Sequence, residues 1–152
     1  MPRLSALDYA LKLLGYRART KREIEQKLTE KDYSTEDVEK VLDKLSGTQL
    51  LDDSKFAANY VRDKLTIGRR GPRRIYFELV KHGVDKDVAD AATKTIDADE
   101  EQIVANQLIE ARSRQWTKLE PLARYRRAIG LLSRRGFSPS VISHTLKDWT
   151  KY

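Results

Sequence analysis

The residues of this sequence that could recognise a charged partner are its arginines, and they gather in two places. Six of the thirteen residues from 62 to 74 are basic: Arg62, Lys64, Arg69, Arg70, Arg73 and Arg74. A guanidinium group is planar and can hold two oxygens of a phosphate or a carboxylate at once. Arg73 and Arg74 fall in the first turn of an expected helix, where the helix dipole disfavours cations. This placement favours an anionic partner over a plain solvated surface.

A second group of basic residues lies in the last third of the chain, among them Arg112, Arg114 and Lys118. Its candidate contact residues are Arg124, Arg126, Arg127, Arg134 and Arg135. Residues seven apart share one face of a helix, as Arg127 and Arg134 do. Cations near the end of a helix also suit its dipole, so a purely structural role stays open for Arg134 and Arg135.

The net charge of +7 is unevenly distributed along the chain. Residues 1–61 carry 11 basic and 11 acidic side chains, whereas residues 62–152 carry 19 basic and 12 acidic ones. A positive excess confined to one part of the chain favours a polyanion or an acidic protein surface as partner. The alternative is an ordinary solvated helical surface.

Several classes of function are disfavoured by what the sequence lacks. It has no cysteine, which excludes disulfides, thiolate metal sites and a catalytic thiol. No carboxylate lies at metal-binding spacing from both histidines, and Gly68 and Gly71 are not followed by the Lys-Ser/Thr of a phosphate loop. No apolar run resembles a signal peptide or a membrane span. We expect a cytoplasmic, non-enzymatic binding protein without metal or cofactor.

The apolar residues recur at spacings of three and four, which predicts nine helices in three groups of three. Helix starts are marked by a capping box, Thr20-x-x-Glu23, and by proline at the first helical position in Gly71-Pro72 and Ser138-Pro139. Among the aromatic residues, we expect Tyr9 and Tyr60 in the core and Trp116 covering a joint between units.

The three groups repeat one pattern. Leu28, Leu79 and Leu132 stand 51 and 53 residues apart. Gly83 and Gly136 each end a helix in the left-handed conformation, where alanine is expected to cost about 1 kcal/mol. The pattern predicts an all-α protein of tandem three-helix repeats in an elongated array whose neighbours share core. We place the units at residues 1–48, 49–96 and 97–152.

The central unit carries a resemblance to the RecX family of regulatory proteins. The matching stretches are Leu50-Leu51-Asp52-Asp53, Phe56-Ala57, Arg62, Gly68-x-x-Gly71-Pro72-x-x-Ile75-x-x-Glu78-Leu79 and Gly83-Val84. Thr20-x-x-Glu23-Ile24 resembles the family's opening pattern, and Arg134-Arg135-Gly136-Phe137 resembles its ending. One departure is Asp32, which stands where the first unit would be expected to have a glycine.

The resemblance implies a monomeric regulator without catalytic residues or cofactor. It implies binding to the RecA recombinase and its DNA filament, with inhibition of ATP hydrolysis, filament extension and strand exchange, in DNA repair and the SOS response. Weak direct binding to single- or double-stranded DNA would be compatible with it.

Two alternatives stay open. Three-helix units resemble helix-turn-helix modules, so a general DNA-binding protein is one of them, although no expected helix carries a base-reading set of side chains on one face. The other is a helical protein-interaction scaffold without nucleic-acid contact. Relative binding to bare single-stranded DNA, RecA alone and the RecA–DNA filament distinguishes the three hypotheses.

Overall fold

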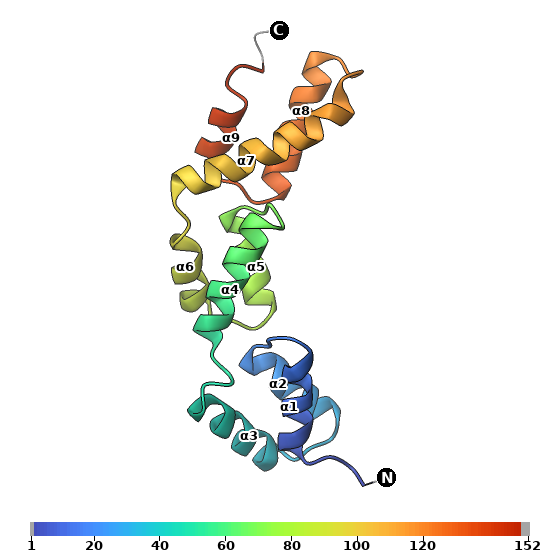
Figure 1. Ribbon diagram of the computed structural model, residues 1–152, viewed down its shortest axis with the longest axis vertical. Coiled ribbons are helices and arrows are strands. Elements are labelled where there is room, and N and C mark those ends of the chain that lie inside the picture. Colours follow the sequence, from blue (N-terminus) through green and yellow to red (C-terminus); the bar gives the residue numbers. More distant parts are fainter. Residues whose placement is uncertain (1, 150–152) are drawn as a thin grey trace.

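The computed structural model describes residues 2–149 as an elongated array of helices, with the two ends of the chain at opposite ends of the molecule (Figure 1). The described helices are α1 (Ala6–Tyr16), α2 (Lys21–Glu30), α3 (Thr35–Gly47), α4 (Asp53–Thr66), α5 (Pro72–Lys81), α6 (Lys86–Lys94), α7 (Ala98–Ser113), α8 (Pro121–Arg134) and α9 (Pro139–Thr145), with a 3-10 helix, η1 (Arg114–Trp116), after α7. The predicted all-α array of nine helices is confirmed, and η1 is an addition. None of the described helices is both long and apolar enough to cross a membrane.

Local signals explain where these helices begin. The Thr20 hydroxyl accepts a hydrogen bond from the Glu23 N–H, and the Glu23 carboxylate accepts one from the Thr20 N–H, which completes the predicted capping box. The side chains of Ser5, Ser34 and Asp52 cap α1, α3 and α4, each by accepting one hydrogen bond from the backbone N–H three residues further on. Three further helices, α5, α8 and α9, start with proline at a position where a missing N–H costs nothing.

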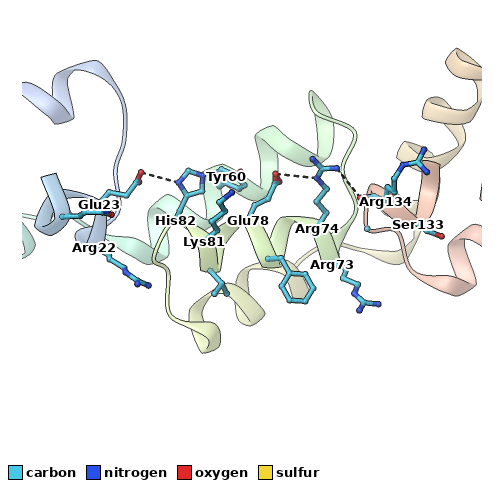
Figure 2. A pocket seen from close by; sticks show the side chains of 14 residues that line it. Arg22, Glu23, Tyr60, Arg73, Arg74, Glu78, Lys81, His82, Ser133 and Arg134 are labelled. Carbon is cyan, nitrogen blue, oxygen red and sulfur yellow. Dashed lines mark hydrogen bonds and ion pairs between the residues drawn. The ribbon is translucent and has the colours of Figure 1, made fainter. Parts of the chain in front are cut away.

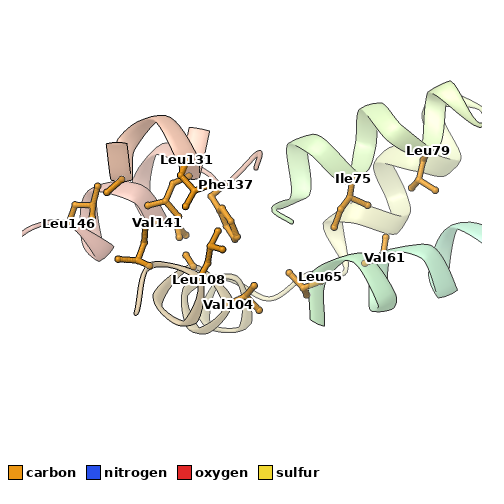
Figure 3. Packing of buried hydrophobic residues seen from close by; sticks show 14 of the residues in the cluster. Val61, Leu65, Ile75, Leu79, Val104, Leu108, Leu131, Phe137, Val141 and Leu146 are labelled. Carbon is orange, nitrogen blue, oxygen red and sulfur yellow. The ribbon is translucent and has the colours of Figure 1, made fainter. Parts of the chain in front are cut away.

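The core is divided into two parts. The first unit, α1 to α3, has its own cluster of buried side chains around Ile24, Leu28 and Leu45. The second and third units share one continuous cluster, in which Leu65 of α4 and Val104 of α7 lie between the two halves (Figure 3). The prediction that neighbouring units share core is therefore right for the second joint and wrong for the first.

The first joint, between the first and second units, is polar instead. The Thr20 hydroxyl donates to the His82 carbonyl at 2.5 Å, and the Lys21 N–H donates to Asp53 Oδ1 at 3.0 Å. Burial raises the pKa of Asp53 and the charges of nearby acidic residues add to this, although the bond from Lys21 opposes it. Hydrogen bonds rather than apolar contacts thus position the first unit.

The second helices of the three units lie end to end. At the joint between the second and third units, the Gly71 N–H donates to the Arg135 carbonyl at 2.6 Å and the Arg73 N–H donates to the Gly136 carbonyl at 3.1 Å. The carboxyl end of α8 therefore meets the amino end of α5, just as the carboxyl end of α5 meets α2 through Thr20. Opposite ends of helix dipoles face each other at both joints, and groups that a helix end leaves unpaired find partners there.

Glycines make these close approaches possible. Gly83 and Gly136 have φ of 99° and 83°, as predicted for left-handed helix ends. A Cβ on Gly136 would overlap the Arg74 backbone nitrogen, and one on Gly83 would lie 2.5 Å from the Arg22 Cβ. Asp32 has the equivalent left-handed conformation at the end of α2, with φ of 63°, but it is exposed. A residue with a side chain is therefore accommodated at position 32, because no neighbouring unit packs against the backbone there.

Candidate functional site

A groove of about 970 Å³ runs along α5 and reaches both neighbouring units. It is lined by Arg22, Glu23 and Gln26 of α2, by Tyr60 of α4, by Arg73, Arg74, Phe77, Glu78, Val80, Lys81 and His82 on or just after α5, and by Ser133, Arg134 and Gly136 on or just after α8. Figure 2 shows Arg22 at one end of this row of side chains and Arg134 at the other. Because all three units contribute, the groove depends on both joints.

One of the two carboxylates in the groove, Glu23, is fully engaged within the protein. Its carboxylate lies 2.7 Å from an Arg17 guanidinium nitrogen and 3.5 Å from His82 Nδ1, and it accepts the bond from the Thr20 N–H. Burial alone would raise the pKa of Glu23. The hydrogen bonds from Arg17 and Thr20, with the charges of Arg17 and His82, outweigh it and leave that pKa below its ordinary value.

The other carboxylate, Glu78, is neutralised by Arg70, which does not line the groove. One Arg70 nitrogen lies 2.9 Å from Oε1 and 2.7 Å from Oε2 of Glu78. Within the described chain, four cations of the groove form no ion pair: Arg22, Arg73, Lys81 and Arg134. Arg74 has only a longer contact of 3.7 Å to Glu78. The groove is therefore strongly positive.

The central group of candidate residues divides by availability. Arg73 is exposed, and its guanidinium lies 5.9 Å from the centre of the Phe77 ring. Arg74 is also exposed and donates to the Arg134 carbonyl at 3.3 Å. Arg70 is half-buried in its pair with Glu78, and Arg69 is a half-buried turn residue with φ of 49°. Of the four, Arg73 is the most available to a partner.

The joint also gives a structural reason for cations at the start of α5. The carboxyl end of α8 lies against this helix start, so the negative end of one dipole offsets the positive end of the other. Arg74 makes use of this arrangement through its bond to the Arg134 carbonyl. The unusual placement of Arg74 is thus partly explained without a partner, whereas Arg73 retains no charged contact within the described chain.

Arg62 and Lys64 do not line the groove. The Arg62 guanidinium pairs with Glu100 at 2.6 Å and so ties α4 to α7. The Lys64 ammonium group lies 5.3 Å from the centre of the Tyr60 ring. Both side chains have partners inside the protein.

The second group of candidates is also divided. Arg134 lines the groove, whereas Arg135 donates to the Gly68 carbonyl at 2.7 Å across the joint. Burial lowers the pKa of Arg135, and the charges of Arg112, Arg74 and Arg70 lower it further. The structure therefore brings the two groups together at one joint. The remaining candidates lie elsewhere on α8: Arg124 lines a smaller pocket with Trp149, and Arg126 and Arg127 are exposed outside the groove.

Sequence reasoning missed several groove residues. The candidates did not include Arg22, Lys81 or Phe77. In the structure Phe77 is 57% exposed. Tyr60 was expected in the core but is only partly buried and lines the groove, where its ring lies 5.2 Å from that of His82. The repeat could have directed attention to residues flanking the glycines of the joints. Trp116 was expected to cover a joint between units. It is buried in the core that the second and third units share, directly after α7.

The chain matches three family models in order along its length. They describe the first, second and third three-helix domains of RecX and match residues 6–45, 52–92 and 99–146. The regulatory protein RecX of Mycobacterium sp. (strain KMS) is 40% identical over 138 residues, which cover 88% of this chain and 75% of that protein. The protein of the same name from Mycolicibacterium smegmatis is 35% identical over 140 residues, covering 90% and 74%.

Solved structures show the same likeness. A crystal structure of regulatory protein RecX superposes with a TM-score of 0.85 at 32% identity and covers 94% of this chain and 71% of that one. RecX from Lactobacillus salivarius superposes with a TM-score of 0.85 at 24% identity, covering 97% and 96%, and supports the fold. With three matching domains and relatives at this identity, the chain belongs to the RecX family of regulatory proteins.

Proposed function

We propose that this protein binds RecA on single-stranded DNA and restrains it, slowing filament extension, ATP hydrolysis and strand exchange. The observation that carries the proposal is the match of all three RecX domains along the chain. The proposal includes action as a monomer, in the cytoplasm where such a filament forms.

The shape and charge of the molecule support this proposal. An elongated array presents a long surface relative to its mass, which suits a partner that is itself a long polymer (Figure 1). The groove along α5 adds a positive surface, and both DNA phosphates and acidic protein surfaces are complementary to it.

The proposal also assigns no catalytic step to this protein. Carboxylates are common general acids and bases, and a general base has to be free to take a proton. In the groove, both Glu23 and Glu78 are held by arginines. Within the described residues, no cluster of three or more His, Asp or Glu side chains has the arrangement to hold a metal ion.

The direct test is RecA activity on a single-stranded substrate. We expect the rate of ATP hydrolysis by RecA on circular single-stranded DNA, and the yield of strand exchange, to fall as this protein is added. Protein unfolded beforehand, at the same concentration, controls for effects of added mass and charge. If a several-fold molar excess over RecA leaves both rates unchanged, the proposed function is wrong.

A further inference from the structure

We propose that Arg3 closes the free end of the helical array and prevents a second copy of this protein from docking there. The inference goes beyond the proposed function. Its test uses neither RecA nor DNA, so each of the two can fail while the other stands. It starts from the carboxyl ends of α2, α5 and α8, which are equivalent positions of the repeat.

These three helices end in the same way. The carbonyl of a buried leucine accepts a hydrogen bond from the N–H five residues further on, at 3.2, 3.0 and 3.1 Å for Leu28, Leu79 and Leu132. The residue three positions after the leucine caps the helix, and the residue after that has a positive φ. The three capping residues are Lys31, His82 and Arg135. Their carbonyls can therefore be compared directly.

At the two joints, a neighbouring unit supplies the donor to this carbonyl. The Arg135 carbonyl accepts from the Gly71 N–H at 2.6 Å, and Gly71 belongs to the second unit. The His82 carbonyl accepts from the Thr20 hydroxyl at 2.5 Å, and Thr20 belongs to the first unit. The carboxyl end of a second helix is thus the surface on which the next unit docks.

At the free end of the array, the donor comes from the segment before α1. The Arg3 guanidinium donates to the Lys31 carbonyl and lies 4.0 Å from the centre of the Tyr33 ring. The Tyr33 hydroxyl donates to the Leu4 carbonyl at 2.6 Å, which holds the segment beside that ring. Arg3 therefore takes the place that a neighbouring unit takes at the joints.

Asp32 keeps the same end closed in a second way. At both joints the left-handed residue is a glycine, and an added Cβ would lie 2.5 Å from the Arg22 Cβ or overlap the Arg74 backbone nitrogen. Asp32 has the equivalent conformation, so its side chain would meet an approaching helix start in the same manner. Glycine would be less strained at this φ, which favours a role for the side chain itself.

The partner that this end excludes is a second copy of the chain. Among the second helices of the described units, α8 is the one whose start meets no other unit, and it lies at the opposite end of the molecule (Figure 1). Like α5, it begins with proline and has no side-chain cap. Leu122 in its first turn is 57% exposed. The two ends of the molecule thus resemble the two halves of its internal joints.

Docking of these ends would join copies head to tail. The negative end of the α2 dipole would face the positive end of the α8 dipole, as opposite ends already face each other at both joints. Such a contact uses different surfaces on the two copies and leaves one of each exposed, so it does not stop at a dimer. The cap at Arg3 therefore keeps the free protein monomeric.

The test is static light scattering of the protein alone, from about 10 µM to about 1 mM. The key variant is Arg3→Ala, Asp32→Gly, which opens the end of α2 and relieves strain at position 32. The matched control is Lys12→Ala, Asp43→Ala, which also removes one exposed cation and one exposed anion from the first unit. Circular dichroism verifies that both variants are folded.

The wild type and the control should keep the mass of a single chain at every concentration. A contact between two helix ends is much smaller than the roughly 1,200 Å² of a stable interface, so we expect the key variant to associate with a Kd of about 1 mM. For open head-to-tail association, its weight-average mass should then rise about twofold over the series. Asp32→Gly alone should rise less, because Arg3 still occupies the Lys31 carbonyl.

Leu122→Glu, added to the key variant, identifies the surface that docks. It places a carboxylate in the first turn of α8, and the negative end of the α2 dipole repels that charge. The mass of a single chain should return.

Four results would overturn the inference. The key variant could remain a single chain at the highest concentration, or it could associate equally well with Leu122→Glu. Asp32→Gly alone could associate as strongly as the key variant, which would leave Arg3 without the proposed role. The wild type or the control could associate as the key variant does.

Discussion

Replacing Gly71 by alanine should separate the second and third units, although the backbone at this residue is unstrained. Gly71 caps α5 with φ of −84°, which any residue can adopt. A Cβ there would lie 2.5 Å from the carbonyl carbon and oxygen of Gly136 and from the Phe137 nitrogen. All three are backbone atoms, so no side chain can turn away. The joint has to open by about 1 Å to restore ordinary contact.

The magnitude follows from the bonds that cross this joint. Opening by that distance stretches the hydrogen bonds from the Gly71 and Arg73 N–H groups, now 2.6 and 3.1 Å, beyond useful length. Each contributes about 1 kcal/mol, and a buried group left unpaired costs about 1–3 kcal/mol. Allowing for partial rescue by water, we expect Gly71→Ala to lower the free energy of unfolding by about 3 kcal/mol.

The assay is urea unfolding followed by tryptophan fluorescence and by circular dichroism on the same samples. Both tryptophans, Trp116 and Trp149, lie in the third unit, so fluorescence reports the unit beyond the altered joint. The matched control is Gly15→Ala in α1, where a new Cβ would meet no atom within 4 Å. There, alanine should stabilise by about 0.5–1 kcal/mol. A fluorescence midpoint for Gly71→Ala equal to that of the wild type would refute the described packing of the joint.

Four further predictions concern the joints, the ion pairs and the overall shape. Gly83→Ala and Gly136→Ala should each cost more than the roughly 1 kcal/mol of the left-handed conformation alone. A Cβ on Gly83 would lie 2.5 Å from the Arg22 Cβ, which cannot move without its backbone, and one on Gly136 would overlap the Arg74 backbone nitrogen. Unchanged melting temperatures for either variant would contradict this. Arg70→Ala should destabilise by about 1–2 kcal/mol by leaving the half-buried Glu78 with only its longer contact to Arg74, and Arg73→Ala should be neutral in the same denaturation assay. The pKa of Glu23 is lowered in the folded state, so its carboxylate stabilises the fold at neutral pH, and this stabilisation is lost as the pH falls below about 4.5. Glu23→Gln should therefore make the free energy of unfolding decrease less steeply as the pH falls through this range. An unchanged slope would count against the pair with Arg17. The radius of gyration from X-ray scattering should exceed the roughly 15 Å expected of a compact domain of this length, and a value of 15 Å would rule out the elongated array.

The helices were predictable because their signals are local. The repeated leucines at positions 28, 79 and 132 are each fully buried, as their common register required. The capping box at Thr20 and the left-handed glycines at 83 and 136 depend on neighbours within a few residues, which periodicity and turn chemistry reveal.

The joints and the groove could not be predicted in the same way. The bond between Thr20 and His82 links residues 62 positions apart, and nothing in their local sequence indicates it. The polar character of the first joint was missed for the same reason, and with it the position of Arg22 opposite Gly83. Arg70 was identified as a cation, but its partner Glu78 depends on how the turn before α5 folds back.

A comparison of binding targets tests the central claim most directly. The same labelled protein is titrated at physiological salt with bare single-stranded DNA, with RecA alone and with the assembled RecA–DNA filament. A RecA regulator should bind the filament more tightly than either component alone. Equal affinity for bare DNA and filament would indicate a general DNA-binding protein, and no binding to any of the three would contradict the account.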